Sequence, residues 1–167
     1  MIVRLKLNGR VVEAEAEDNE LLLDFIRDKL GVKSIKAACW RGECGACMAI
    51  VNGKAVKTCL MLAVEANEGE VTTAEGLAGN EAISPLQKIF VKHGAMQCGF
   101  CTPAFVVNVH YLLSEDPEAS EEELKEKLSG MICRCGTYNQ MLPAIREAKS
   151  LYLRERKKAQ PIASSMS

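Results

Sequence analysis

The sequence predicts an α+β protein in which a β-rich first half precedes an all-helical second half. Two observations separate the halves: strand-like alternation with Asn-Gly turns in the first, and helix-start signals before apolar stripes in the second. A third observation joins them, because each half carries four of the eight cysteines. The boundary is expected in the connector EANEGEVTTAEGLAGNE, which gives a first domain over 1–77, a helical domain over 78–156 and a flexible tail over 157–167.

The first hairpin is predicted at the N-terminus. Apolar and charged residues alternate over 3–7 and again over 12–16, on either side of the hairpin signal Asn8-Gly9. An apolar stripe with helical spacing over 22–30 then predicts a helix.

A second hairpin is expected after the cysteine-rich loop. Residues 48–51 and 54–57 flank Asn52-Gly53, which is again a hairpin signal. Two hairpins, one helix and a cysteine loop are typical of a small α+β domain.

The second half is expected to contain four helices, which favours a four-helix bundle. Three of them have a start signal in which a capping residue or proline precedes an apolar stripe. These signals are Ser84-Pro85, Thr102-Pro103, and Ser120 with Glu123. The fourth helix is expected from about 140 to 156.

Overall charge and hydropathy narrow the function classes. There are 21 basic and 22 acidic residues and a net charge of −1, which argues against a nucleic-acid-binding surface. No apolar run approaches the roughly 18 residues of a membrane span, and the N-terminus has no signal-peptide pattern. We therefore expect a cytoplasmic protein without a membrane span, where clustered thiols more often bind metal or do redox chemistry than form disulfides.

The first cysteine set has a spacing with a specific meaning. The first three members follow C-x4-C-x2-C, and eleven residues separate the third from the fourth. The set consists of Cys39, Cys44, Cys47 and Cys59. The x4/x2 spacing is that of plant-type [2Fe–2S] ferredoxins. Zinc is the alternative, although zinc sites more often consist of two C-x2-C pairs.

The residues around this set suit an anionic centre. Gly42 and Gly45 let the backbone curl tightly enough to direct several amides toward sulfur. Arg41 and Lys36 are expected to supply nearby positive charge.

The second set is less specific. It follows C-x2-C and then C-x-C, and its members are Cys98, Cys101, Cys133 and Cys135. The first two precede the helix start at Thr102-Pro103, where backbone amides favour anionic ligands. Zinc and an iron–sulfur cluster both fit this spacing.

Four motifs together carry a family resemblance. The chain resembles the small iron–sulfur subunit of the molybdenum hydroxylases, the xanthine oxidase and aldehyde oxidoreductase superfamily, over nearly its whole length. The motifs are CWRGECGAC, VKTCLMLA, QCGFCTP and ICRCGTY. Two departures spare the cysteines: the family's usual CRCTGY is CRCGTY here, and CGACTV is CGACMA.

The resemblance implies a fold and two cofactors. The fold is a plant-type ferredoxin-like (β-grasp) domain followed by an all-α four-helix-bundle domain, each holding one [2Fe–2S] cluster. The first set would hold the cluster nearer the flavin of a partner, and the second set the cluster nearer the molybdenum cofactor. Gln97 and Cys135 would also approach the molybdopterin.

The resemblance also implies a function and partners. The chain would pass electrons from a large molybdopterin-binding subunit to a medium FAD-binding subunit, in a heterotrimer or a dimer of heterotrimers. It would be part of an oxidoreductase without a catalytic site of its own. Two other readings of the thiols are a zinc-stabilised adaptor and a stand-alone ferredoxin.

Overall fold

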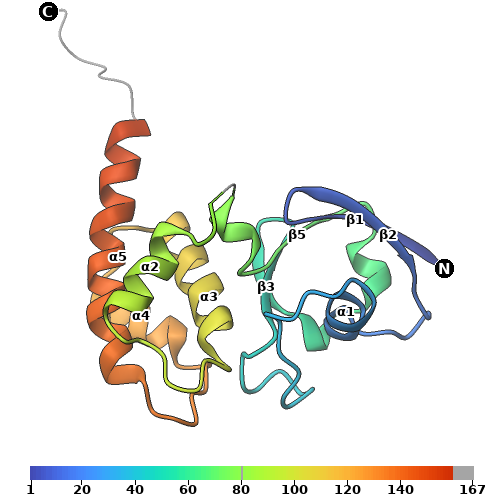
Figure 1. Cartoon of the computed structure of the whole chain (residues 1–167), viewed down its shortest axis with the longest axis horizontal. Coiled ribbons are helices and arrows are strands. Elements are labelled where there is room, and N and C mark those ends of the chain that lie inside the picture. Colours follow the sequence, from blue (N-terminus) through green and yellow to red (C-terminus); the bar gives the residue numbers. More distant parts are fainter. Residues whose placement is uncertain (80, 160–167) are drawn as a thin grey trace, which may run out of the picture.

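A computed structural model describes residues 1–79 and 81–159 of the 167-residue chain. Figure 1 shows a lobe built around a β-sheet beside a lobe built from helices, with the chain crossing once from the first to the second. The two halves predicted from the sequence therefore correspond to two separate regions of the molecule.

The first lobe contains a five-stranded mixed sheet in the order β2-β1-β5-β3-β4. Its strands are β1 (Ile2–Leu7), β2 (Arg10–Glu15), β3 (Met48–Val51), β4 (Lys54–Lys57) and β5 (Glu70–Thr72). Both predicted hairpins are confirmed, since β1 pairs with β2 and β3 with β4, all antiparallel. At both turns the Asn and Gly have positive φ, as a two-residue hairpin loop requires.

Strand β5 corrects the sequence analysis, which placed its residues at the end of the domain and in the connector. It lies at the middle of the sheet, parallel to β1 and antiparallel to β3. Only Val71 of its three residues is buried, so the strand has almost no alternation of its own. Pairing partners on both sides, distant in sequence, create this strand.

The predicted first helix is present but short. It runs as α1 (Leu22–Asp24) and continues into a π-helical turn over Phe25–Lys29. Leu22, Leu23, Phe25 and Ile26 are fully buried, and they fill the core beneath the sheet. Short 3₁₀ turns follow at Thr58–Leu60, Ala63–Ala66 and Gly76–Ala78.

The regular secondary structure of the second lobe consists of helices, within its described residues. Its helices are α2 (Pro85–Lys92), α3 (Thr102–Glu115), α4 (Glu121–Leu128) and α5 (Tyr138–Ala159). Ser84 and Ser120 cap α2 and α4 through the predicted capping boxes. The last helix takes in residues 157–159, and the rest of the expected tail, 160–167, lies outside the described residues.

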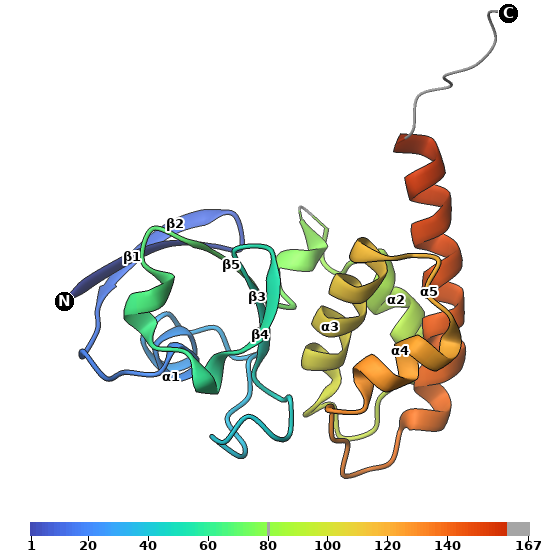
Figure 2. The same cartoon turned by 180° about the vertical axis from the view of Figure 1, so that it is seen from behind.

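The two lobes share a packed boundary. Helix α3 packs against β3, and Met48 and Ala74 of the first lobe belong to the apolar core of the second. Figure 2 shows α3 facing the β3–β4 side of the sheet. Among the described helices, none combines the length and apolar character needed to cross a membrane.

Candidate metal centres

The loop of the first cysteine set is folded by residues with positive φ. Trp40, Gly42 and Gly45 have φ of 50°, 73° and 73°. This curl brings the amides of Arg41 and Cys44 to 3.4 and 3.5 Å from Cys39 Sγ. The amides therefore point at sulfur, which is the environment that an anionic metal–thiolate centre needs.

The thiols of this set approach one another in pairs, Cys39 with Cys44 and Cys47 with Cys59. Hydrogen bonds from the backbone amides of Cys44 and Arg41 lower the pKa of Cys39 to about 6. Burial raises the pKa of Cys47 to about 12. A bound metal ion would keep both thiols deprotonated and release protons on binding.

Thr58 fixes the fourth member of the set. Its amide and hydroxyl donate to the Cys47 carbonyl at 3.2 and 2.9 Å, and its side chain is fully buried. Cys59 follows directly, so these bonds hold it beside Cys47. An eleven-residue gap suffices because β3 and β4 return the chain to the loop.

The second set comes from two loops, one before α3 and one before α5. Its thiols also approach in pairs, Cys98 with Cys135 and Cys101 with Cys133. Burial raises the pKa of Cys101 to about 12, whereas the Phe100 amide lowers the pKa of Cys98. Cys98 is exposed and Cys101 is buried, so the site reaches the surface at Cys98.

Two residues that the sequence analysis did not assign to the site hold the second loop. The Thr137 hydroxyl lies 3.0 Å from Cys133 Sγ. Burial raises the pKa of Cys133, but hydrogen bonds from Thr137, Cys101 and the Cys135 backbone together outweigh it and lower that pKa to about 7. The Tyr138 hydroxyl accepts from the Cys133 amide at 2.7 Å and donates to the Met131 carbonyl at 3.2 Å. Both residues lie in the CRCGTY motif, so this motif was the sequence signal that could have identified them.

Gln97 lies beside the second cysteine set. Its side-chain amide donates to the Cys135 carbonyl at 3.2 Å, so these two residues are neighbours. Gln97 is exposed and Cys135 is half-buried. A partner molecule could therefore reach both.

The two cysteine loops are joined directly. The Ile132 amide donates to the Cys44 carbonyl at 3.0 Å, and Ile132 precedes Cys133. Met131 is 2 % exposed and lies against Gly45. One hydrogen bond thus connects the backbone of a first-set cysteine to the neighbour of a second-set cysteine.

The paired thiols suit a centre with two metal ions. A [2Fe–2S] cluster places two cysteine thiolates on each iron, and each set offers two pairs. All eight cysteines are free thiols. Within residues 1–79 and 81–159, no three His, Cys, Asp or Glu side chains gather closely enough to hold a single metal ion.

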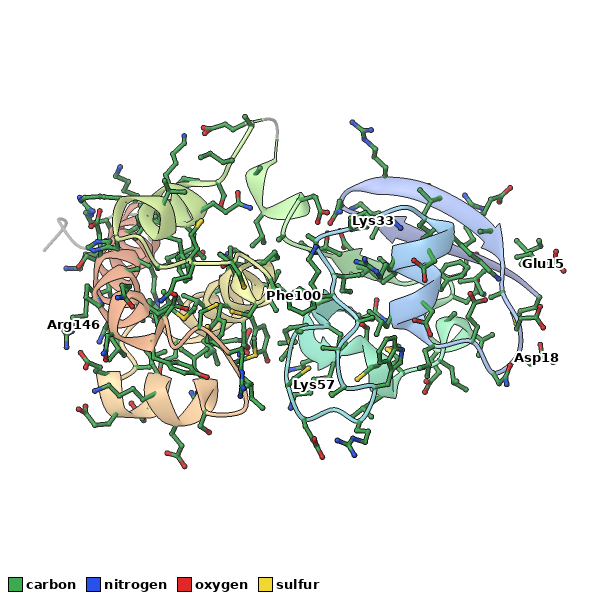
Figure 3. The ribbon with its side chains drawn as sticks, turned by 60° about the horizontal axis from the view of Figure 1, so that its bottom comes forward. Glu15, Asp18, Lys33, Lys57, Phe100 and Arg146 are labelled. Carbon is green, nitrogen blue, oxygen red and sulfur yellow. The ribbon has the colours of Figure 1, made fainter. Side chains whose placement is uncertain are left out.

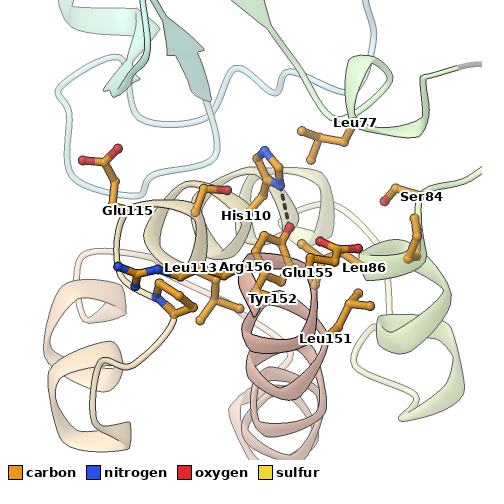
Figure 4. Close-up of a pocket in the computed structure, with 13 residues that line it drawn as sticks. Leu77, Ser84, Leu86, His110, Leu113, Glu115, Leu151, Tyr152, Glu155 and Arg156 are labelled. Carbon is orange, nitrogen blue, oxygen red and sulfur yellow. Dashed lines mark hydrogen bonds between the residues drawn. The ribbon is translucent and has the colours of Figure 1, made fainter. Parts of the chain in front are cut away.

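A large pocket lies away from both sets. Its volume is about 600 Å³, and it is lined by α3, α5 and the start of α2. Within it His110 Nδ1 and the Tyr152 hydroxyl are 2.5 Å apart (Figure 4). No cysteine lines this pocket, so the chemistry of the thiols does not depend on it.

Comparison with family models assigns a binding function to both halves. Residues 5–81 match the 2Fe-2S iron-sulfur cluster binding domain, and residues 73–146 match the [2Fe-2S] binding domain. The chain is therefore an iron–sulfur protein with two [2Fe–2S]-binding domains.

Similar proteins of known class show which kind of iron–sulfur protein this chain is. The chain is 42 % identical over 146 residues to the small FeS subunit of nicotinate dehydrogenase from Eubacterium barkeri, covering 87 % of this chain and 93 % of that one. It is 37 % identical over 163 residues to PaoA, the iron-sulfur-binding subunit of an aldehyde oxidoreductase from Escherichia coli (strain K12), covering 89 % and 71 %. It superposes on a chain of quinoline 2-oxidoreductase from Pseudomonas putida 86 with a TM-score of 0.87 and 32 % identity, covering 96 % and 98 %. The chain belongs to the family of small iron–sulfur subunits of molybdenum hydroxylases, which confirms the resemblance seen in the sequence.

Proposed function

We propose that this chain conducts electrons between a molybdopterin-binding subunit and an FAD-binding subunit of a molybdenum-dependent hydroxylase or dehydrogenase. One observation carries the proposal: two sets of paired thiols lie in adjacent loops joined by the hydrogen bond between Cys44 and Ile132. When bound, [2Fe–2S] clusters supply the one-electron chemistry, and the protein supplies their placement and tuning.

The two cysteine sets define the ligands. Cys39, Cys44, Cys47 and Cys59 hold the first cluster, and Cys98, Cys101, Cys133 and Cys135 hold the second. The domains are a β-grasp domain over 1–77 and a four-helix bundle over 78–156. Support comes from the separate apolar cores of the two lobes.

The exposed side of the second site is where the molybdopterin-binding subunit docks. Cys98 and Gln97 are exposed there, and Phe100 and Ile132 expose 45 % and 54 % of their surface. Exposed apolar side chains grouped around a reactive site are typical of a protein interface.

The rim of the first site is where the FAD-binding subunit docks. Trp40 and Leu60 are 49 % and 66 % exposed and adjoin the first loop and Cys59. The assembly is a heterotrimer or a dimer of heterotrimers. A cytoplasmic location agrees with eight free thiols.

Purification of the complex under anaerobic conditions tests the proposal. We expect about four irons and four acid-labile sulfides per chain, and two distinct paramagnetic signals on reduction. Chains that carry molybdenum and flavin should co-purify.

Two results would contradict the proposed function. Zinc without visible absorption would identify an adaptor stabilised by zinc. A stable monomer that contains both clusters but has no molybdenum- or flavin-bearing partner would identify a stand-alone ferredoxin.

A further inference from the structure

Lys57 places a positive charge beside the first cysteine loop. It ends strand β4, two residues before Cys59, and its side chain is half-buried. Its Nζ donates to the Gly42 carbonyl at 2.6 Å. Gly42 lies between Cys39 and Cys44, so the ammonium group is anchored on the loop that bears three of the first-set thiols.

The same ammonium group lies at the boundary between the two sites. A Cβ atom on Gly130 would be 3.6 Å from Lys57 Nζ, and a Cβ atom on Gly45 would be 3.1 Å from the Gly130 carbonyl oxygen. Gly130 leads through Met131 and Ile132 into Cys133. Figure 3 shows Lys57 on the side of the sheet lobe that faces the helical lobe.

No carboxylate neutralises this charge within the described part of the chain, where none lies within 4.0 Å of Lys57 Nζ. Glu65 lines the same surface pocket, and its carboxylate accepts from the Leu62 amide at 2.6 Å and lies more than 4.0 Å from Lys57 Nζ. The rest of that pocket is lined by Met48, Leu60 and other apolar residues.

The cations expected from the sequence are placed differently. The Arg41 guanidinium pairs with Glu43 at 3.3 Å on an exposed surface, which offsets its charge. Lys36 Nζ donates to the Lys33 carbonyl at 2.7 Å. Of these three cations, Lys57 is the one whose charged group is hydrogen-bonded to the backbone of the cysteine loop and has no carboxylate of the described residues within 4.0 Å.

A fixed cation affects the two oxidation states of a cluster unequally. Reduction adds one negative charge, so a nearby positive charge stabilises the reduced state more than the oxidised state. Partly apolar surroundings weaken screening and enlarge this difference. The effect is largest for the nearer centre.

From this geometry we infer that Lys57 raises the reduction potential of the first cluster relative to the second. It thereby favours the step in which the second cluster is oxidised and the first is reduced by one electron. The inference rests on the proposed function, because it needs both cysteine sets to hold clusters.

The test is a potentiometric titration of the assembled complex, followed by the paramagnetic signals of both clusters. In Lys57→Met, the reduced-to-oxidised ratio of the first cluster at a fixed potential should fall about tenfold, which is about 59 mV for a one-electron couple. The second cluster should shift less, in the same direction. Lys57→Arg should retain the wild-type potentials.

Two further variants separate charge from other causes. Lys54→Met removes the same charge from the exposed start of the same strand and should leave both potentials unchanged. Lys57→Gln keeps a donor for the Gly42 carbonyl but loses the charge, so its potentials should match those of Lys57→Met. It replaces Lys57→Met in the test if that variant fails to fold.

Unchanged first-cluster potentials in Lys57→Met or Lys57→Gln, with both signals intact, would overturn the inference alone. An equal shift in Lys57→Arg would also overturn it, since contact rather than charge would then be the cause. Absence of two cluster signals in the wild-type complex would instead overturn the proposed function.

Discussion

The two cysteine sites are built in opposite ways. Three of the four first-set thiols come from one nine-residue loop, and its amides turn toward sulfur through residues with positive φ. The second site joins two loops separated by α3 and α4, and side-chain hydroxyls from Thr137 and Tyr138 fix its geometry. The first site therefore depends on local backbone conformation, and the second depends on the packing of helices.

Replacing one ligand in each site gives the largest effect. Cys135→Ser should abolish the second cluster signal and about half of the iron while leaving the first signal, because the sheet lobe has its own core. Cys44→Ser should do the converse. Iron content and low-temperature paramagnetic spectra measure both. If both signals survive in either variant with normal turnover, the ligand sets are wrong.

Two glycines with the same backbone conformation allow the packing of the two cysteine loops to be compared. Gly45 and Gly136 both have φ of 73°, but a Cβ on Gly45 would lie 2.5 Å from Met131 Sδ, whereas nothing lies within 4 Å of a Cβ on Gly136. Gly136→Ala should cost about 1–2 kcal/mol of unfolding free energy from backbone strain. Gly45→Ala should cost about 1–3 kcal/mol more from overpacking. Denaturant unfolding of the full chain measures both, and equal losses would mean that the loops are not closely packed.

A pair of buried threonines tests the role of side-chain hydroxyls in the second site. Thr137→Val removes the hydroxyl beside Cys133 Sγ and should cost about 0.5–1.5 kcal/mol, with a more negative potential for the second cluster. Thr102→Val is the matched control, because the Thr102 hydroxyl is buried without a partner among the described residues. It should be neutral or stabilising. An unchanged second-cluster potential in Thr137→Val would contradict this role.

The smallest expected effect is the response to acid. Both histidines lie in the second half, and burial lowers the pKa of His110 from 6.5. As the pH drops below about 6.5, His110 takes up a proton in the unfolded chain before it does so in the folded chain. The free energy of unfolding therefore falls with falling pH. His110→Gln should flatten the slope of unfolding free energy between about pH 7 and 5. An unchanged slope in the holo-chain would rule out this contribution.

Local signals explain what the sequence predicted well. Both hairpins and the starts of α2 to α4 depend on residues close together in the chain. Family resemblance then added the cofactors and the electron-transfer role, and the comparisons confirm that family.

Contacts between residues far apart in the sequence explain the features that the sequence did not predict. Strand β5 is defined by its partners β1 and β3 rather than by its own residues. Lys57 follows the pattern of an ordinary strand residue, and only the folded loop brings the Gly42 carbonyl to it. Arg41 looked available as a charge, but Glu43 two residues away pairs with it.

The exposure of Cys98 has a consequence for how the complex is put together. A thiolate at the surface is open to oxidants and chelators, whereas Cys101 and Cys133 are shielded. An isolated chain held in air should lose iron from the second site before the first. Under the proposed function, docking of a molybdopterin-binding subunit on this face soon after iron insertion would shield the second site from oxygen.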